Sequence, residues 1–368
     1  MEPEPHKASI RFYEIDLLRF LAALSVVFYH YTYRGFTQGN YSPLEFPEIG
    51  RVTRYGYLGV ELFFIISGYA VLLSAQGKTV RQFFLSRITR LYPAFWVACT
   101  LTFTVKRLWG THTEDVMILE WLHAGTGQYF YNMTMLQHFF KVPDLDGAYW
   151  SLAIEITFYF LVSILIGYQL IRHLDWVLLG WLGFVALRWR FHADSSFDEL
   201  LFPNYAPYFI AGMVFFLLQQ PSGRTAFRYG LLAIAYLLAL RANWANTNVM
   251  GDFFQITYSH LVTAGSITAF FAIFYLISFR KIDLSRFTWL AGLGSLTYPL
   301  YLLHCDIGFI VFHRLGNVVN KYVLVAGTFA AMLAGAYLIH QFIEKRFGKP
   351  LGVWVNKSLD ALKRRSVG

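Results

Sequence analysis

Apolar residues follow one another in long, nearly uninterrupted runs along this chain, without the strict alternation of half-buried strands. About 20 consecutive apolar residues are enough for one helix to cross the hydrocarbon core of a bilayer, so each long run predicts a membrane-spanning helix. The predicted spans are 12–34, 55–76, 91–108, 150–171, 174–190, 204–220, 229–241, 254–278, 289–313 and 322–344.

Basic residues are unevenly divided between the loops that join these spans. When the spans alternate in direction from a cytoplasmic N-terminus, most Lys and Arg residues fall on the cytoplasmic side, in agreement with the positive-inside rule. Both termini are therefore predicted to be cytoplasmic. The placement of basic residues on the cytoplasmic side then explains the net charge of +9, and no nucleic-acid partner is expected. Because no cleavage pattern follows the first apolar run, we expect a retained first helix and not a removed signal peptide.

The composition agrees with this arrangement. With 56% hydrophobic and only 14% charged residues, the chain does not fit a soluble domain with one buried core. The predicted fold class is all-α, a polytopic membrane helix bundle of about ten transmembrane helices that lies in the lipid bilayer. We expect one integral membrane domain at 1–345 and a basic cytoplasmic tail at 346–368. The long aromatic loop 109–148 is expected to form an extracytoplasmic cap, the alternative being an unstructured connector.

Cysteines and histidines give no sign of a metal site. Cys99 and Cys305 both lie in predicted spans, so we expect them to pack in the bundle and to form no disulfide. None of the 11 histidines belongs to a short paired motif with a carboxylate or cysteine. We therefore expect no metal.

Arg19 and His30 are the most informative pair of residues. They lie eleven positions apart within one apolar run, so a helix places both on the same face, about 16 Å apart along its axis. An arginine at membrane depth costs about 2.5–3.5 kcal/mol on insertion scales and usually faces a protein interior or a wet cavity. The alternative is an arginine that extends to the membrane surface and an interfacial histidine.

Other polar residues are predicted at similar depth on different helices. Glu61 and Glu155 lie in the outer halves of the second and fourth spans, about level with His30, and Ser151 shares a helix face with Glu155. His304 and Asp306 lie in the ninth span. A structural hydrogen-bond network explains any one of them, but the whole set favours a functional site.

Arg87 and Arg90 lie at helical spacing on the predicted cytoplasmic side, just before the third span. Two guanidinium groups on one helix face suit phosphate groups. The alternative is that these arginines only anchor the helix at the inner surface.

Five segments, in order along the chain, carry the polar residues of the spans. They are RFLAALSVVFYH (Arg19 and His30), GVELFFIISGY (Glu61, Ser67 and Gly68), FFLSRITRLYPAFW (Arg87 and Arg90), GAYWSLAIEITFYF (Trp150, Ser151 and Glu155) and YPLYLLH (His304). Together they resemble motifs of the bacterial acyltransferase-3 family of integral membrane acyltransferases. The first resembles the family's motif of an arginine and a histidine separated by ten residues. The resemblance extends from residue 12 to about 305, nearly the whole membrane part.

This resemblance implies an enzyme of the bacterial inner membrane that moves an acyl group, commonly acetyl, from cytoplasmic acyl-CoA to a hydroxyl group. The acceptor is expected to be a carbohydrate, such as an envelope glycan or a lipid-linked sugar. We expect the transfer to finish within the membrane domain. The identity of the acceptor and the length of the acyl chain stay open.

The residues can be given roles in such a transfer. A neutral imidazole can take the proton of a sugar hydroxyl, so His30 is the predicted general base, with Glu61 or Glu155 to orient it. An acyl-histidine intermediate is the alternative to direct transfer. Arg19 is expected to polarise the thioester carbonyl or to bind part of the CoA arm.

The remaining candidates are assigned to the two substrates. For the donor, acetyl-CoA, they are Arg87, Arg90, Arg19, Ser67 and Gly68. For the acceptor, Tyr149 and Trp150 suit stacking on a sugar face, although an aromatic belt at the membrane surface is the alternative. Ser151 and His304 complete the acceptor set, and His304 is the second candidate for the base.

Two other classes of protein compete with an enzyme. Charges inside a membrane also mark the proton relays of a proton-coupled transporter, but such a protein more often shows two similar halves, which are not seen here. A catalytically silent sensor would tolerate substitution of His30. Transfer or hydrolysis of acyl-CoA would distinguish the enzyme from both.

Overall fold

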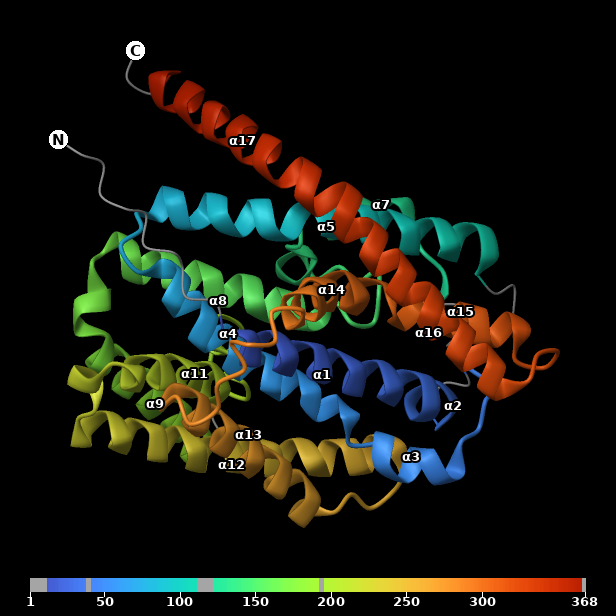
Figure 1. The fold of residues 1–368 in the computed structure, drawn as a ribbon, viewed down its shortest axis with the longest axis horizontal. Helices are drawn as coiled ribbons and strands as arrows, with labels where there is room; N and C mark the ends of the chain where they lie inside the picture. The colour runs from blue at the N-terminus through green and yellow to red at the C-terminus, as the bar shows by residue number, and fades with distance from the viewer. Residues whose placement is uncertain (1–11, 38–40, 111–121, 192–194, 366–368) are drawn as a thin grey trace.

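The computed structural model describes residues 12–37, 41–110, 122–191 and 195–365, and every regular element in them is helical. The predicted all-α fold class is therefore confirmed. The long helices, which form one bundle (Figure 1), are α1 (Tyr13–Tyr29), α4 (Gly59–Ala75), α5 (Val80–Trp109), α8 (Trp150–Gly167), α9 (Leu174–Phe191), α11 (Ala206–Gln219), α12 (Ala226–Phe254), α13 (His260–Ser278), α14 (Leu290–Leu303), α15 (Cys305–Leu315), α16 (Lys321–Leu338) and α17 (Lys345–Arg365).

Within these described ranges, seven helices are long and apolar enough to cross a membrane, or eight if the bent pair α14 and α15 forms one span. The protein is thus a multi-pass membrane protein. The helices α5 and α12 have 30 and 29 residues but do not belong to this set. The predicted count of ten spans, and the side on which each terminus lies, stay predictions.

Some helix boundaries differ from the predicted spans. The span predicted at 229–241 is part of the much longer α12, and the next helix, α13, begins only at His260. The helix α12 continues because its polar second half has partners inside the bundle. The amide of Asn243 and the hydroxyl of Thr247 both donate to the hydroxyl of Thr263 on α13, at 3.1 and 3.0 Å. Hydropathy alone does not detect such a polar continuation.

The helices α4 and α11 approach each other closely because both carry glycine at their contact. A Cβ atom added to Gly68 would lie 2.0 Å from the carbonyl oxygen of Phe209, and one added to Gly212 would lie 2.0 Å from that of Ile65. Small residues allow such close backbone packing between membrane helices. The contact brings Ser67, the residue before Gly68, to a fixed place in the centre of the bundle.

The C-terminal segment is not an extended tail. A π-helical turn (Ile339–Glu344) joins α16 to α17, and α17 packs along the first half of α5. Arg81 of α5 donates to the side chain and backbone oxygens of Asn356, both at 2.8 Å, and pairs with Asp360 at 2.7 Å. Figure 1 shows α17 at the top of the view, next to α5. The predicted tail is therefore mostly a helix docked on α5.

Part of the predicted cap, 111–121, lies outside the described residues. The described part of the predicted cap contains α7 (Thr126–Asn132) and a short 3-10 turn (Gln137–Phe140). This part is packed against α5: the Trp96 indole donates to the carbonyl oxygen of Met133 at 3.0 Å, and Asn132 is fully buried. The position of the loop outside the cytoplasm stays a prediction.

Candidate active site

His30 and His304 form a pair in the interior of the bundle. Nδ1 of His30 lies 3.1 Å from Nε2 of His304, although the two residues are 274 positions apart in the chain. His304 is fully buried, and His30 is partly buried. The sequence predicts these residues at similar depth on different helices, and the structure brings the two histidines into contact.

Backbone carbonyl oxygens near the two rings indicate which nitrogen of each histidine carries hydrogen. Nδ1 of His304 lies 2.8 Å from the carbonyl oxygen of Tyr301, and Nδ1 of His30 lies 2.9 Å from that of Val26. A carbonyl oxygen only accepts hydrogen bonds, so both Nδ1 atoms must carry hydrogen. His30 Nδ1–H is then shared between Val26 and Nε2 of His304. Nε2 of His30 is left with its lone pair and with no hydrogen bond to any described residue, which is the state that a general base requires.

Both histidines lie where a helix changes its geometry. At His30, α1 passes into a π-helical turn (His30–Arg34). At His304, α14 ends, and α15 continues at an angle of 60°. Irregular turns of this kind often occur at functional sites in helices. Here they bring side chains from two distant segments together.

A cavity of about 380 Å³ is lined by His30. Glu61 also lines this cavity, and Asn246 of α12 donates to one of its carboxylate oxygens at 3.3 Å. The other oxygen, Oε2, is buried and has no hydrogen-bond partner in the described ranges. Trp150 forms another part of the wall and is 37% exposed. The cavity therefore combines an imidazole, a carboxylate and an accessible aromatic ring.

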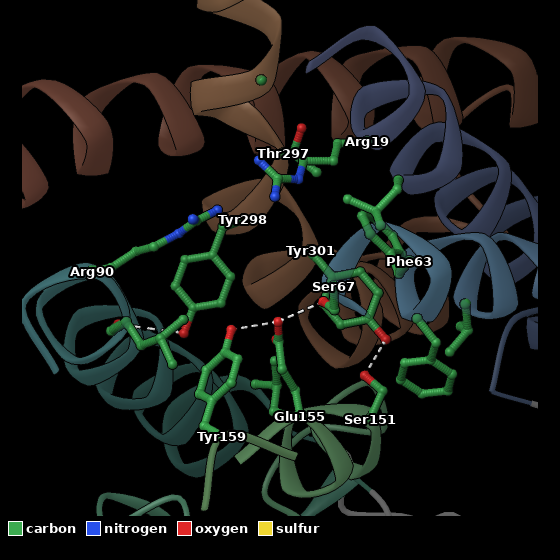
Figure 2. Close-up of a pocket in the computed structure, with 16 residues that line it drawn as sticks. Arg19, Phe63, Ser67, Arg90, Ser151, Glu155, Tyr159, Thr297, Tyr298 and Tyr301 are labelled. Carbon is green, nitrogen blue, oxygen red and sulfur yellow. Dashed lines mark hydrogen bonds between the residues drawn. The ribbon is translucent and has the colours of Figure 1, made fainter. Parts of the chain in front are cut away.

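Arg19 and Glu155 line a second, smaller cavity of about 90 Å³ (Figure 2). Ser67 and Tyr159 both donate to Oε1 of Glu155, at 2.8 and 2.6 Å. Figure 2 shows the guanidinium groups of Arg19 and Arg90 on one side of the cavity and Glu155 on the other. The cavity thus has two cations opposite one hydrogen-bonded carboxylate.

The sequence predicts that Glu61 or Glu155 orients His30, and the described hydrogen bonds differ from this. Glu155 is held by Ser67 and Tyr159 in the second cavity, and Glu61 is bonded to Asn246. His30 is oriented instead by the carbonyl oxygen of Val26 and by His304. The cause is local, because the helical position of His30 places Nδ1 over the carbonyl four residues earlier.

A third cavity, of about 1020 Å³, opens at the end of the bundle that carries Lys78 and Arg280. Arg19 and Arg90 line both this cavity and the second one. The second cavity in turn shares Val60 and Tyr301 with the cavity of His30. The three cavities therefore follow one another through the bundle, with shared walls.

The two arginines predicted to bind phosphate lie differently. Arg90 lines two cavities, whereas Arg87 lines none of the three. The Arg87 guanidinium is buried against the rings of Phe83 and Tyr159, 5.6 and 5.5 Å from their centroids. Arg87 thus contacts Tyr159, which lines the second cavity and donates to Glu155 there.

Three other predicted site residues have mainly structural contacts. Tyr149 is fully buried against Phe95, with ring centroids 5.1 Å apart, so it cannot stack on a sugar. Gly68 does not line the three cavities and faces α11. Ser151 does line the second cavity, and its hydroxyl lies 2.7 Å from that of Tyr301.

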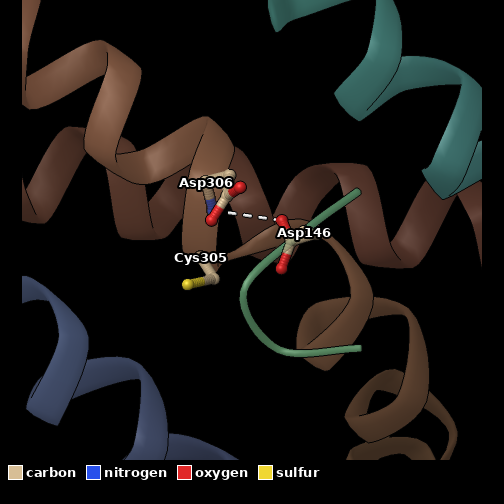
Figure 3. Close-up of side chains that lie close together, drawn as sticks. All are labelled: Asp146, Cys305 and Asp306. Carbon is tan, nitrogen blue, oxygen red and sulfur yellow. Dashed lines mark hydrogen bonds between the residues drawn. The ribbon is translucent and has the colours of Figure 1, made fainter. Parts of the chain in front are cut away.

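A buried polar cluster braces the bend at His304. Lys106 of α5 pairs with Oδ2 of Asp306 at 2.5 Å, and the other carboxylate oxygen of Asp306 accepts the backbone N–H of Gly147 at 3.0 Å. Asp146 accepts the backbone N–H of Asp306 at 3.0 Å (Figure 3). Burial and the nearby Asp306 raise the pKa of Asp146 well above its usual value. The cluster ties the loop before α8 to the first residues of α15.

Asp146, Asp306 and Cys305 place three potential ligand atoms close together (Figure 3). The Lys106 ammonium already occupies one side of Asp306, and it disfavours a metal cation there. The expectation of no metal stays a prediction.

Tyr301, Tyr159 and Asn246 belong to the site but were not singled out in the sequence. Tyr159 follows Glu155 by four positions, a spacing that places both on one helix face. Tyr301 lies within the YPLYLLH segment. Asn246 lies in the polar half of α12, beyond the predicted span, so its approach to Glu61 depends on the tertiary fold.

The bundle and its buried histidine cavity define a membrane protein with a polar internal site. A family model described as "Acyltransferase domain" (acyltransferase 3) matches residues 12–341, and the chain belongs to this family. The protein is therefore an acyltransferase, and the transporter and sensor alternatives are not supported.

Individual relatives agree with the family. The chain is 22% identical to acyltransferase MdmB of Streptomyces mycarofaciens, over 93% of each chain. It is 29% identical to the putative peptidoglycan O-acetyltransferase YrhL of Bacillus subtilis over 39% of this chain and 22% of that protein. Its similarity to peptidoglycan O-acetyltransferase OatA of Listeria monocytogenes is 28%, over 39% of this chain and 22% of the relative. The chain thus spans less than a quarter of the last two. No solved structure has a significant match.

Proposed function

We propose that this acyltransferase moves an acetyl group from cytoplasmic acetyl-CoA to a hydroxyl of an envelope carbohydrate. The observation that carries the proposal is the row of three cavities, which leads from Lys78 and Arg280 past Arg19 to His30. A long, thin donor with phosphates at one end and a thioester at the other suits such a path.

The donor is proposed to enter through the 1020 Å³ cavity. Lys78, Arg280 and Arg90 line it and offer positive charge for the phosphates of CoA. Positive residues also favour the cytoplasmic side of a membrane, which agrees with entry from that side. The pantetheine arm would then extend into the narrow second cavity, between Arg19 and Glu155.

The chemical step needs one base and one leaving group. The acceptor hydroxyl gives its proton to the free Nε2 of His30 while its oxygen attacks the thioester carbonyl carbon. The carbon–sulfur bond then breaks, and the proton is passed to the leaving thiolate, so the products are an ester and CoA. The imidazolium formed at His30 is supported by the carbonyl oxygen of Val26 and by Nε2 of His304. Arg19 is proposed to polarise the thioester carbonyl.

The carbohydrate acceptor is supported by two observations. Two relatives are named as peptidoglycan O-acetyltransferases, one of them putative. The exposed ring of Trp150 lines the cavity of His30 and offers an apolar face to a sugar. The proposed location is the bacterial inner membrane, with the acceptor on the outer side.

The experiment is transfer of radiolabelled acetyl from acetyl-CoA to envelope glycans by membranes that contain the protein. His30→Ala is compared with wild type at matched expression, and His173→Ala, an exposed histidine away from the cavities, is the matched control. Loss of the general base should reduce labelling by about 10²–10⁴-fold in His30→Ala alone. Equal labelling by all three would remove His30 from the mechanism, and absence of label with wild type would contradict the donor or the acceptor.

A further inference from the structure

A fourth cavity, of about 500 Å³, lies next to the cavity of His30. Its walls come from the 3-10 turn that contains His138, from the first half of α8, from the end of α9, and from α10 (Asp198–Leu201) with the turn that follows it. Of the residues that line this cavity, the transfer proposed above uses only Trp150. The cavity is therefore available for a separate role.

Two aromatic residues separate this cavity from that of His30. Trp150 and Tyr205 line both cavities, and their ring centroids are 5.6 Å apart. Tyr205 is supported by Phe64 of α4, with centroids 5.2 Å apart. A molecule that lies in the fourth cavity thus touches the same rings as a molecule at His30.

The fourth cavity is lined by both aromatic and hydrogen-bonding groups. Trp189 adds a half-buried indole to the wall. Arg188 donates to Oδ2 of Asp198 at 2.7 Å, while Oδ1 of Asp198 is buried and has no hydrogen-bond partner in the described part of the chain. The side chains of Glu199 and Asn204 are exposed at the wall and offer further oxygen and nitrogen atoms.

These walls fit a sugar better than other ligands. A sugar ring has an apolar face for an indole and hydroxyl groups for carboxylates and amides. A lipid chain would leave the buried Oδ1 of Asp198 without a polar contact. A free phosphate would meet the negative charges of Asp198 and Glu199.

We infer that the fourth cavity is a second carbohydrate subsite, which holds a sugar unit next to the one that receives the acyl group. The inference rests on the proposed carbohydrate acceptor. It means that the acceptor is a chain of at least two sugars, which passes by Trp150 and Tyr205, and not a single sugar. Glycans that are free or linked to a lipid share this chemistry.

The test measures binding directly, so it does not depend on transfer. The purified full-length protein is immobilised, and soluble glycan fragments from the envelope of the producing cells are passed over it, labelled at their reducing ends. We expect fragments of two or more sugars to be retained, and Trp189→Ala to reduce retention about tenfold. Trp176→Ala is the matched control, because Trp176 is an exposed tryptophan at the other end of α9. In a parallel arm, a lipid extract of the same cells is passed over the protein. Comparison of retention in the two arms distinguishes lipid-linked from free glycans.

Two further variants distinguish the loss of a sugar contact from misfolding of the protein. Trp189→Phe keeps an aromatic ring and should retain more glycan than Trp189→Ala. Glu199→Ala changes only an exposed residue of the wall and should also weaken retention. Equal retention by wild type, Trp189→Ala and Glu199→Ala, or no retention in either arm, would overturn the subsite.

Release of CoA from acetyl-CoA by the same preparations separates this proposal from the proposed function. Trp189→Ala should release CoA at the wild-type rate in the absence of glycan, because Trp189 lines no donor cavity. If the wild-type protein releases no CoA, acetyl-CoA is not the donor and the proposed function fails. The retention of glycan fragments would still test the second subsite. A parallel loss of CoA release and retention in Trp189→Ala would show a general defect and contradict a specific subsite.

Discussion

Lys106 and Asp306 form an ion pair of 2.5 Å in which the two side chains are only 2% and 1% exposed. The pair joins α5 to the first turn of α15, directly after His304. Its burial makes it sensitive to the loss of either partner, since one charge would then remain in the interior without a counter-charge.

Lys106→Met should therefore destabilise the protein by about 3–5 kcal/mol, measured as a lower unfolding temperature in detergent. The double variant Lys106→Met/Asp306→Asn should recover part of the loss, because it removes the uncompensated charge. Lys357→Met, at an exposed lysine of α17, is the control and should change little. A stable Lys106→Met protein would show that the pair does not brace the bend.

His304→Phe should lower the rate of acyl transfer by about tenfold, less than the loss of His30 itself. The substitution removes Nε2, the acceptor that shares the Nδ1 proton of His30 at 3.1 Å, and the imidazolium of His30 then loses one of its two supports. The rate as a function of pH is the measurement. An unchanged rate and pH profile would show that the contact plays no part in catalysis.

Glu155→Ala should be more harmful than Glu155→Gln. Alanine leaves the hydroxyls of Ser67 and Tyr159 without their acceptor and leaves Arg19 and Arg90 without the carboxylate in this cavity. Hydrogen bonds to a charged group are worth about 1.5–3 kcal/mol each, whereas glutamine still offers one oxygen. Thermal unfolding of the two variants compares them. Equal stability would mean that the two hydrogen bonds contribute little.

Gly68→Ala should strongly reduce the amount of folded protein, because the new methyl group would lie 2.0 Å from the carbonyl oxygen of Phe209. Helices α4 and α11 would have to move apart. Gly265→Ala is the matched control, since a Cβ there meets no atom within 4 Å. Its yield and unfolding temperature should equal those of wild type. A well-folded Gly68→Ala protein would contradict the close contact.

Asp144→Asn should stabilise the protein at neutral pH. Burial raises the pKa of Asp144, so the folded state favours the neutral acid and loses stability as the pH rises through that raised pKa. Asparagine stays neutral, and its oxygen can still accept from Gln137, which now donates to Oδ1 of Asp144 at 2.7 Å. Unfolding temperatures between pH 4 and pH 8 should show a gain at high pH that disappears at low pH. A constant difference would contradict this origin.

Several residues that the sequence singles out lie near one another in the structure. Arg19 and His30 lie on one helix, and their apolar surroundings indicate an internal role, because isolated charges are costly at membrane depth. The same reasoning predicted Glu61, Glu155 and His304 at similar depth on other helices. In the structure Glu61 and Glu155 line cavities, and His304 contacts His30. The site roles themselves stay predictions.

Other parts could not be predicted. Tyr149 looked suitable for a sugar, but the packing of Phe95 buries it completely. The spacing of Arg87 and Arg90 does not distinguish them. In the structure Arg87 is buried against Tyr159, whereas Arg90 lines the cavities. Spacing along a helix defines a face, but neighbouring helices decide whether that face meets a cavity or a packed core.

The sequence by itself determined the membrane environment, the helical class and the family, because long apolar runs and local motifs are properties of continuous segments. Only the tertiary structure decided that His30 lies at hydrogen-bond distance from His304 and that Glu61 and Glu155 bond to other residues. It also decided that three cavities follow one another toward this pair. These features depend on helix bends at His30 and His304 and on the close approach of α4 and α11. They arise from distances between segments far apart in the chain, which no local pattern encodes.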